Sequence, residues 1–102
     1  MEDQKILTRY RYQSTTASLT EQNTFSEAVR LLGRFNFSLA GTWAGTVFVQ
    51  RSFDAGMTWR DVNSYTANIE DGGNEAEIGV IYRAGFKTGG YTSGTADVRL
   101  SQ

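Results

Sequence analysis

Short runs in which apolar and polar residues alternate make up much of the chain. In residues 34–40 (Arg-Phe-Asn-Phe-Ser-Leu-Ala) apolar side chains alternate with polar ones, which is the pattern of a strand with one buried face. Other runs are rich in β-branched and aromatic residues, which also favours strands. The strands expected on these grounds cover residues 34–40, 46–51, 58–62, 64–67, 78–83 and 95–100.

Clusters rich in glycine separate these runs. Gly and Asn tolerate positive φ, so such clusters favour turns. The expected turns cover residues 41–45, 54–56, 71–74 and 89–94. Turns that recur between short strands predict an all-β protein, an antiparallel β-sandwich or barrel, rather than alternating strands and helices.

Residues 24–32 leave two interpretations open. Apolar residues recur there at helical spacing, and Thr24 with Glu27 fits a helix capping box. The apolar positions concerned are Phe25, Ala28, Val29 and Leu32. The same stretch also fits a strand followed by a turn at Gly33. Because the rest of the chain is so uniformly β, we expect strand or irregular structure here.

The first 23 residues differ in character from the rest. Residues 4–13 are polar with a few large apolar side chains, and residues 14–18 carry almost no side chain that could fill a core. Two interpretations stay open: an N-terminal arm that pairs with something else, or an ordinary edge strand of the same sandwich. We therefore divide the chain into residues 1–23, the arm or edge strand, and residues 24–102, the sandwich domain.

Composition narrows the chemistry. The 102 residues include no Cys and no His, which removes disulfides, thiolate and imidazole metal ligands, and the commonest general base. The net charge is −1 and the ten Lys and Arg residues are spread along the chain, so we expect no nucleic-acid partner. No apolar run reaches the length of a membrane span or signal core. The sequence therefore predicts binding or assembly, with no catalytic residues, no metal and no cofactor.

The sharpest local motif is residues 52–59 (Ser-Phe-Asp-Ala-Gly-Met-Thr-Trp). It fits the pattern S-x-D-x-G-x-T-W and so resembles the Asp-box of sialidases and other β-propeller proteins. In such a turn the carboxylate accepts hydrogen bonds from turn amides, Gly supplies positive φ, and Trp packs over the turn. We expect a structural turn, since one box cannot supply the blades of a propeller. Its residues are Ser52, Asp54, Gly56, Thr58 and Trp59. The alternative is that an exposed Trp59 or Phe53 contacts a ligand.

Oxygen donors cluster in residues 70–77 (Glu-Asp-Gly-Gly-Asn-Glu-Ala-Glu). Calcium prefers such donors, but the spacing lacks the alternation of an EF-hand loop, so we expect a solvated hairpin tip. Glu75 and Glu77 would share one face of a strand, yet nothing else in the sequence indicates the cleft that glycoside hydrolysis needs.

Five aromatic residues could form a stacking platform for a sugar. Sandwiches routinely bury such side chains, so we favour a core or interface role over ligand stacking. The five are Trp43, Trp59, Tyr65, Tyr82 and Tyr91.

Residues 41–47, the 52–59 motif and residues 91–100 together resemble small virion structural proteins of tailed bacteriophages and prophages. The resemblance covers residues 33–102. It implies a head decoration, or cement, protein: a jelly-roll-like sandwich with an N-terminal arm, which forms a homo-oligomer, a trimer, on the capsid of a virion assembled in the host cytoplasm. It implies no catalytic residues.

The interface residues that we expect come from the arm and from two aromatic positions. They are Ile6, Leu7, Tyr10, Tyr12, Trp43 and Tyr91. The alternative function, from a different class, is a carbohydrate-binding module of a phage tail fibre or tail accessory protein.

Overall fold

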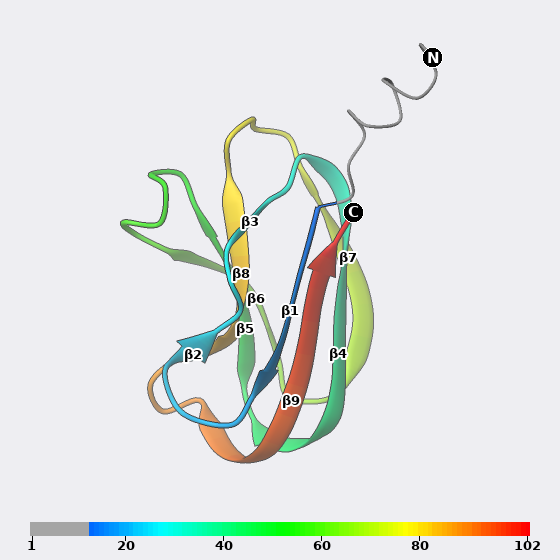
Figure 1. Ribbon diagram of the computed structural model, residues 1–102, viewed down its shortest axis with the longest axis vertical. Helices are drawn as coiled ribbons and strands as arrows, with labels where there is room; N and C mark the ends of the chain where they lie inside the picture. The colour runs from blue at the N-terminus through cyan, green and yellow to red at the C-terminus, as the bar shows by residue number, and fades with distance from the viewer. Residues whose placement is uncertain (1–12) are drawn as a thin grey trace, which may run out of the picture.

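Residues 13–102, the part of the chain that the computed structural model describes, form two antiparallel β-sheets packed face to face (Figure 1). The strands are β1 (Ser14–Leu19), β2 (Thr24–Phe25), β3 (Val29–Arg30), β4 (Gly33–Gly45), β5 (Val47–Ser52), β6 (Arg60–Tyr65), β7 (Ile69–Glu75), β8 (Ile81–Phe86) and β9 (Tyr91–Ser101). The expected all-β sandwich is confirmed. Within residues 13–102 no helix is long and apolar enough to cross a membrane.

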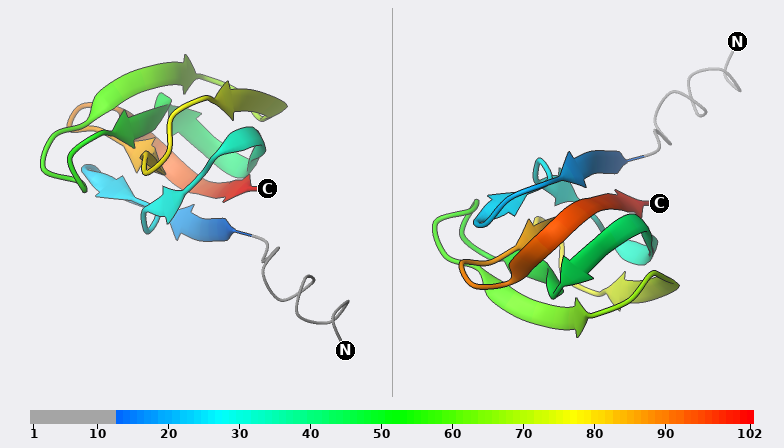
Figure 2. Two further views of the ribbon diagram at one scale, coloured as in Figure 1. Left: turned by 90° about the horizontal axis from the view of Figure 1, so that it is seen from above. Right: turned by 90° about the horizontal axis from the view of Figure 1, so that it is seen from below.

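The strand order is that of a jelly roll. Sheet A has the order β1-β9-β4-β7, and sheet B has the order β2-β8-β5-β6 with β3 also paired to β8. The β5–β6 hairpin is therefore enclosed by successive pairs: β4 with β7, then β2 and β3 with β8, then β1 with β9. When β2 and β3 are counted as one interrupted strand, eight strands wrap into two four-stranded sheets, which is the jelly-roll arrangement (Figure 2).

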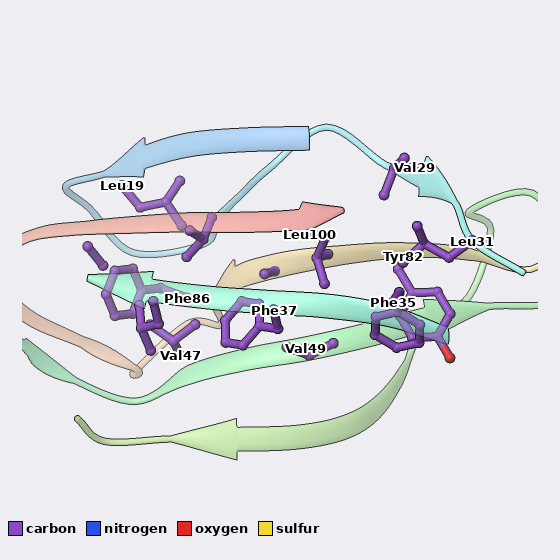
Figure 3. Close-up of a cluster of buried hydrophobic side chains, with 14 of the residues drawn as sticks. Leu19, Val29, Leu31, Phe35, Phe37, Val47, Val49, Tyr82, Phe86 and Leu100 are labelled. Carbon is purple, nitrogen blue, oxygen red and sulfur yellow. The ribbon is translucent and has the colours of Figure 1, made fainter. Parts of the chain in front are cut away.

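The core lies between the two sheets (Figure 3). Successive side chains of a strand point to opposite faces, so alternate residues in the first half of β4 are buried. Phe35, Phe37 and Leu39 of β4 pack in this layer with side chains of β5, β8 and β9. The largest fully buried side chains are Tyr82, Phe37, Phe86, Leu31, Leu39 and Leu100.

Two expected turns are wrong and a third is too long. Residues 41–45 continue β4, residues 71–74 belong to β7, and residues 91–94 of the turn expected at 89–94 begin β9. Glycine serves close approach at these positions. A Cβ on Gly41 would strike backbone of β9, and a Cβ on Gly73 would strike the Phe35 ring, which lies over it from the neighbouring strand. An aromatic side chain that covers a cross-strand glycine compensates for the packing that the glycine lacks.

Other boundaries also differ from the expectation. The two strands expected at 58–62 and 64–67 are one strand, β6, whose register against β5 shifts at a bulge. The strand expected at 78–83 begins only at Ile81, because Gly79 has a φ of 90° in a turn. Residues 24–32 contain the short strands β2 and β3, so the preference for strand or irregular structure is confirmed.

The N-terminal region of the sandwich begins before the expected boundary at residue 24. Residues 14–19 form β1, an edge strand whose six residues pair with β9, and Thr15 and Leu19 are buried. Small side chains suffice there because an edge strand covers the margin of the core, where little volume has to be filled. Residues 1–12 lie outside the described part of the chain, and with them the expected interface residues Ile6, Leu7, Tyr10 and Tyr12.

The register assigns every loop to one of two ends. β1 begins beside the end of β9, β4 begins beside the end of β7, and β8 begins beside the end of β5. We call one end the upper end, as drawn in Figure 1. It holds residue 13, residues 31–32, 53–59 and 76–80, and Gln102. The lower end holds residues 20–23, 66–68 and 87–90.

Candidate functional site

The 52–59 turn at the upper end is held together by two side chains. Asp54 Oδ1 accepts hydrogen bonds from the Thr58 amide (2.9 Å) and the Ser52 hydroxyl (2.7 Å), and Oδ2 accepts one from the Thr58 hydroxyl (2.6 Å). The Ser52 oxygen in turn accepts the Gly56 amide at 2.8 Å. The φ angles of Ala55 and Gly56 are 61° and 93°, so the chain reverses through left-handed backbone that glycine favours.

These hydrogen bonds favour the charged form of Asp54. The Thr58 hydroxyl, the Thr58 amide and the Ser52 hydroxyl lower the pKa of Asp54 to about 2. Trp59 closes the turn, since a Cβ on Gly56 would lie 3.5 Å from its ring. The five residues expected in a structural turn therefore lie together.

A buried carboxylate lies beside this turn, in the segment that was expected to be a solvated tip. The run is exposed as expected except at Glu75, which is only 3% exposed, but residues 69–75 form the strand β7 rather than a hairpin tip. Its Oε1 accepts hydrogen bonds from Arg51 Nη1 (2.9 Å) and the Tyr82 hydroxyl (2.7 Å), and its Oε2 accepts the Glu77 amide (3.0 Å). Glu75 belongs to sheet A, whereas Arg51 and Tyr82 belong to sheet B, so the cluster links the sheets.

The cluster keeps Glu75 charged. Burial raises its pKa, but the hydrogen bonds from Tyr82, the Glu77 amide and Arg51 outweigh burial, so the pKa lies below its ordinary value. Burial and the adjacent carboxylate raise the pKa of Tyr82 to about 12. Within residues 13–102 no three carboxylates are grouped so that they could hold a metal ion.

The upper end also carries exposed apolar side chains. Met57 is 84% exposed and Ile78 is 82% exposed, the two highest values among the large apolar residues of the described chain. Leu32 (49%) and Phe53 (44%) lie on the same end. The loops that carry Met57 and Ile78 both begin at residues bonded to the buried carboxylate. Arg51, which donates to Glu75, directly precedes the 52–59 turn, and Glu77, whose amide donates to Glu75, directly precedes Ile78. We call Leu32, Phe53, Met57 and Ile78 the upper apolar surface.

Trp43 and Tyr91, which were expected at an exposed interface, are partly buried side chains at the lower end. Both rings pack on Phe86, at centroid distances of 6.0 and 5.1 Å. Trp43 Nε1 donates to Asn68 Oδ1 (2.7 Å), and the Tyr91 hydroxyl donates to the Gly94 carbonyl (2.9 Å). Their contacts make them part of the core boundary.

The five aromatic residues do not form one platform. Tyr82 is buried, and Tyr65 stacks on Phe37 while its hydroxyl donates to Asp71 (2.8 Å). Trp59 alone of the five lies on the outer face of sheet B, where the Arg83 guanidinium is 4.2 Å from its ring centroid. The sugar platform proposed from these five side chains therefore reduces to Trp59.

A groove of about 420 Å³ runs between the two sheets beside β6 and β7. Arg51 and Tyr82 of the Glu75 cluster line it together with Arg60, Val62 and Asn74. It adjoins the upper end and gives solvent access to the Arg51 side chain, which is 37% exposed.

Comparison with known protein families, with curated proteins and with solved structures finds no match. Three exposed or partly exposed residues could not be assigned a role from the sequence: Met57 and Ile78 at the upper end, and Arg83 on the outer face of sheet B. The exposure of Ile78 could have been predicted, because an apolar residue directly before a turn glycine does not lie on the buried face of a strand.

Thr58→Ala tests the turn. Without the hydroxyl that contributes most, the pKa of Asp54 should rise from about 2 toward its ordinary 3.8, measured by carboxyl ¹³C NMR titration. A carboxylate whose pKa is lower in the folded state stabilises the fold above its ordinary pKa, and this stability is lost as the pH falls through the folded pKa. The wild-type protein should therefore lose the contribution of Asp54 to the free energy of unfolding between about pH 4 and pH 2. Thr66→Ala, in a lower-end loop, is the control. An Asp54 pKa that is unchanged in Thr58→Ala would contradict the account.

Arg51→Met tests the buried cluster. It leaves Glu75 buried with one hydrogen bond fewer and without its cation, so the free energy of unfolding at pH 7 should fall by roughly 1–3 kcal/mol in urea titrations. The double variant Arg51→Met/Glu75→Gln should recover part of the loss, because the buried charge is gone. The control is Arg99→Met on the outer face of sheet A. Equal losses in Arg51→Met and Arg99→Met would show that Glu75 does not depend on Arg51.

Proposed function

We propose that this protein is a virion structural protein of a tailed bacteriophage, a capsid decoration protein that forms a closed homo-oligomer, a trimer, and binds the capsid through protein contacts. The observation that carries the proposal is the upper apolar surface, where Met57 and Ile78 are almost fully exposed. Residue 13 enters the sandwich at the same end.

The two most exposed large apolar side chains of the described residues, Met57 and Ile78, lie on this one end, and strongly exposed apolar side chains favour an interaction site there. Burying them between subunits removes apolar area from water, which favours association by roughly 25 cal/mol per Å². The loops are also ordered in advance: the Asp54 hydrogen bonds hold one and the Glu75–Glu77 hydrogen bond begins the other. Association of ordered loops loses less conformational entropy than association of loose ones.

The virion context is supported by the resemblance of residues 33–102 and by the fold. Jelly rolls form many viral capsid domains, but also lectins, so the fold alone does not decide the function. A protein that binds the assembled shell and not its dissociated subunits stabilises the shell by mass action, without any chemical step.

A second candidate, the carbohydrate-binding module of a tail fibre or tail accessory protein, is favoured by one observation. Trp59 is partly exposed on the outer face of sheet B, where it and Phe25 both contact Arg83. Aromatic side chains on an open face are the usual stacking partners of sugar rings.

Sedimentation velocity tests the assembly. We expect wild-type protein at tens of micromolar to sediment as a trimer. Met57→Lys/Ile78→Lys should sediment as a monomer, because two added lysines in each of three subunits would bring six like charges to the shared upper end.

The matched control is Ala67→Lys/Thr88→Lys, which adds the same charges to two lower-end loops and should leave the trimer intact. A wild-type monomer, or equal dissociation of both double variants, would count against assembly through the upper end.

Glycan binding tests the second candidate. If sheet B binds sugar, immobilised oligosaccharides should retain the wild-type protein and lose it on Trp59→Ala with the fold intact by circular dichroism. Tyr91→Phe, a conservative change at the lower end, should bind as wild type. Absence of any glycan signal for the wild-type protein would remove this candidate.

A further inference from the structure

Arg83 on the outer face of sheet B is clamped between two aromatic rings. Its guanidinium carbon lies 3.8 Å from the centroid of the Phe25 ring and 4.2 Å from that of the Trp59 ring. Phe25 belongs to β2 and Trp59 follows the Asp54 turn, so the clamp joins two segments far apart in the sequence. Contact with two rings restricts the directions from which a partner can approach the guanidinium.

A third contact sets the orientation of the guanidinium. Arg83 Nε donates to Gln50 Oε1 at 2.9 Å, and Gln50 is 6% exposed. Gln50 Nε2 donates to Asp61 Oδ1 (2.9 Å), and Asp61 Oδ2 accepts Lys87 Nζ (2.7 Å). The chain of hydrogen bonds holds Gln50 with its oxygen toward Arg83. The guanidinium is therefore ordered before any partner arrives, which reduces the entropy lost on binding.

The remaining donors of Arg83 have no acceptor within residues 13–102. Its one hydrogen bond there is the Nε bond to Gln50, and the ion pairs of this part of the chain are Arg51–Glu75 and Lys87–Asp61. Every buried polar side-chain atom of the described residues has a hydrogen-bond partner, so the terminal nitrogens of Arg83 reach solvent. Burial of the guanidinium lowers the pKa of Arg83, with no carboxylate to offset it. An ordered, partly desolvated cation with a free fork is suited to a carboxylate.

The charge around Arg83 also favours an acidic partner. The register places Arg30 opposite Ile81, on the same outward face as Arg83 and Lys87. Asp61 on this face already pairs with Lys87, and Glu27 is exposed in the connection between β2 and β3, which flank β8. Arg30 and Arg83 have no ion pair among the described residues.

We propose that the outer face of sheet B is a docking surface for an acidic protein segment, in which an Asp or Glu carboxylate of the partner accepts a forked pair of hydrogen bonds from Arg83. Arg and Trp are the side chains most often found at the energetic centre of protein interfaces. A protein partner fits better than an acidic sugar, because the ring faces of Phe25 and Trp59 that meet Arg83 are already covered by its guanidinium. The inference rests on the proposed assembly function and names the partner chemistry of a second surface.

Titration of ¹⁵N-labelled protein with acetylated hexaglutamate tests the site. The Arg83 Nε–H and Trp59 indole N–H signals should shift saturably, and the shifts should weaken with added salt. Arg83→Lys keeps the charge but loses the fork, so the dissociation constant read from the Trp59 signal should rise about tenfold. Phe25→Leu, which removes one ring and leaves Arg83, should weaken binding as well and serves if Arg83→Lys does not fold.

Two controls separate this site from general charge attraction. Arg99→Lys, on the outer face of sheet A, should bind hexaglutamate as wild type, and hexaglutamine should produce no shift. The docking surface would be overturned by hexaglutamate leaving both signals unmoved, or by equal binding of Arg83→Lys. Shifts with an oligogalacturonate and none with hexaglutamate would overturn the protein partner in favour of an acidic saccharide.

The test is independent of trimer formation. Arg83→Lys leaves the upper apolar surface intact and should sediment as the wild-type protein does. Met57→Lys/Ile78→Lys should still bind hexaglutamate through Arg83, so loss of assembly and loss of docking are separate results.

Discussion

The upper end of this jelly roll depends on the buried carboxylate of Glu75. Its hydrogen bonds to Arg51 and Tyr82 cross from sheet A to sheet B, and its hydrogen bond to the Glu77 amide begins the loop that carries Ile78. A buried charge is tolerated only when its oxygens are fully paired, and here both are. Arg51 directly precedes the 52–59 turn. One carboxylate therefore positions the bases of the two loops that carry Phe53, Met57 and Ile78 of the upper apolar surface, and the proposed assembly rests on that positioning.

The register of β5 against β8 assigns the arginines of sheet B to opposite roles. Arg51 lies opposite Tyr82 and faces inward to Glu75, whereas Gln50 lies opposite Arg83 and faces outward. Because side chains alternate along a strand, a slip of one residue would exchange these faces. The same pairing thus maintains the inward cluster that stabilises the sandwich and the outward guanidinium that we propose as a docking site. The Asp54 turn joins the two, since it follows Arg51 and ends at Trp59, one of the rings that clamp Arg83.

Strand alternation was enough to predict the all-β sandwich, and the 52–59 motif was enough to predict its turn, because both depend on neighbours in sequence. The turns predicted at 41–45 and 71–74 were wrong, because glycine there leaves room for a side chain or the backbone of another strand. Phe35 over Gly73 is an example. In the acidic run 70–77, the burial of Glu75 could not be predicted, because the side chains that pair with it belong to sheet B. Arg83 could not be recognised for the same reason: its rings and its glutamine come from three other segments.

The central claim is that subunits meet at the upper end. A dilution series that follows the methyl NMR signals of Met57 and Ile78 tests it most directly, with Ile69, 38% exposed and at the lower end, as the internal reference. The account predicts that the Met57 and Ile78 signals shift or broaden as concentration rises through assembly, while the Ile69 signal stays in place. Assembly that moves Ile69 and leaves Met57 and Ile78 unchanged would contradict it.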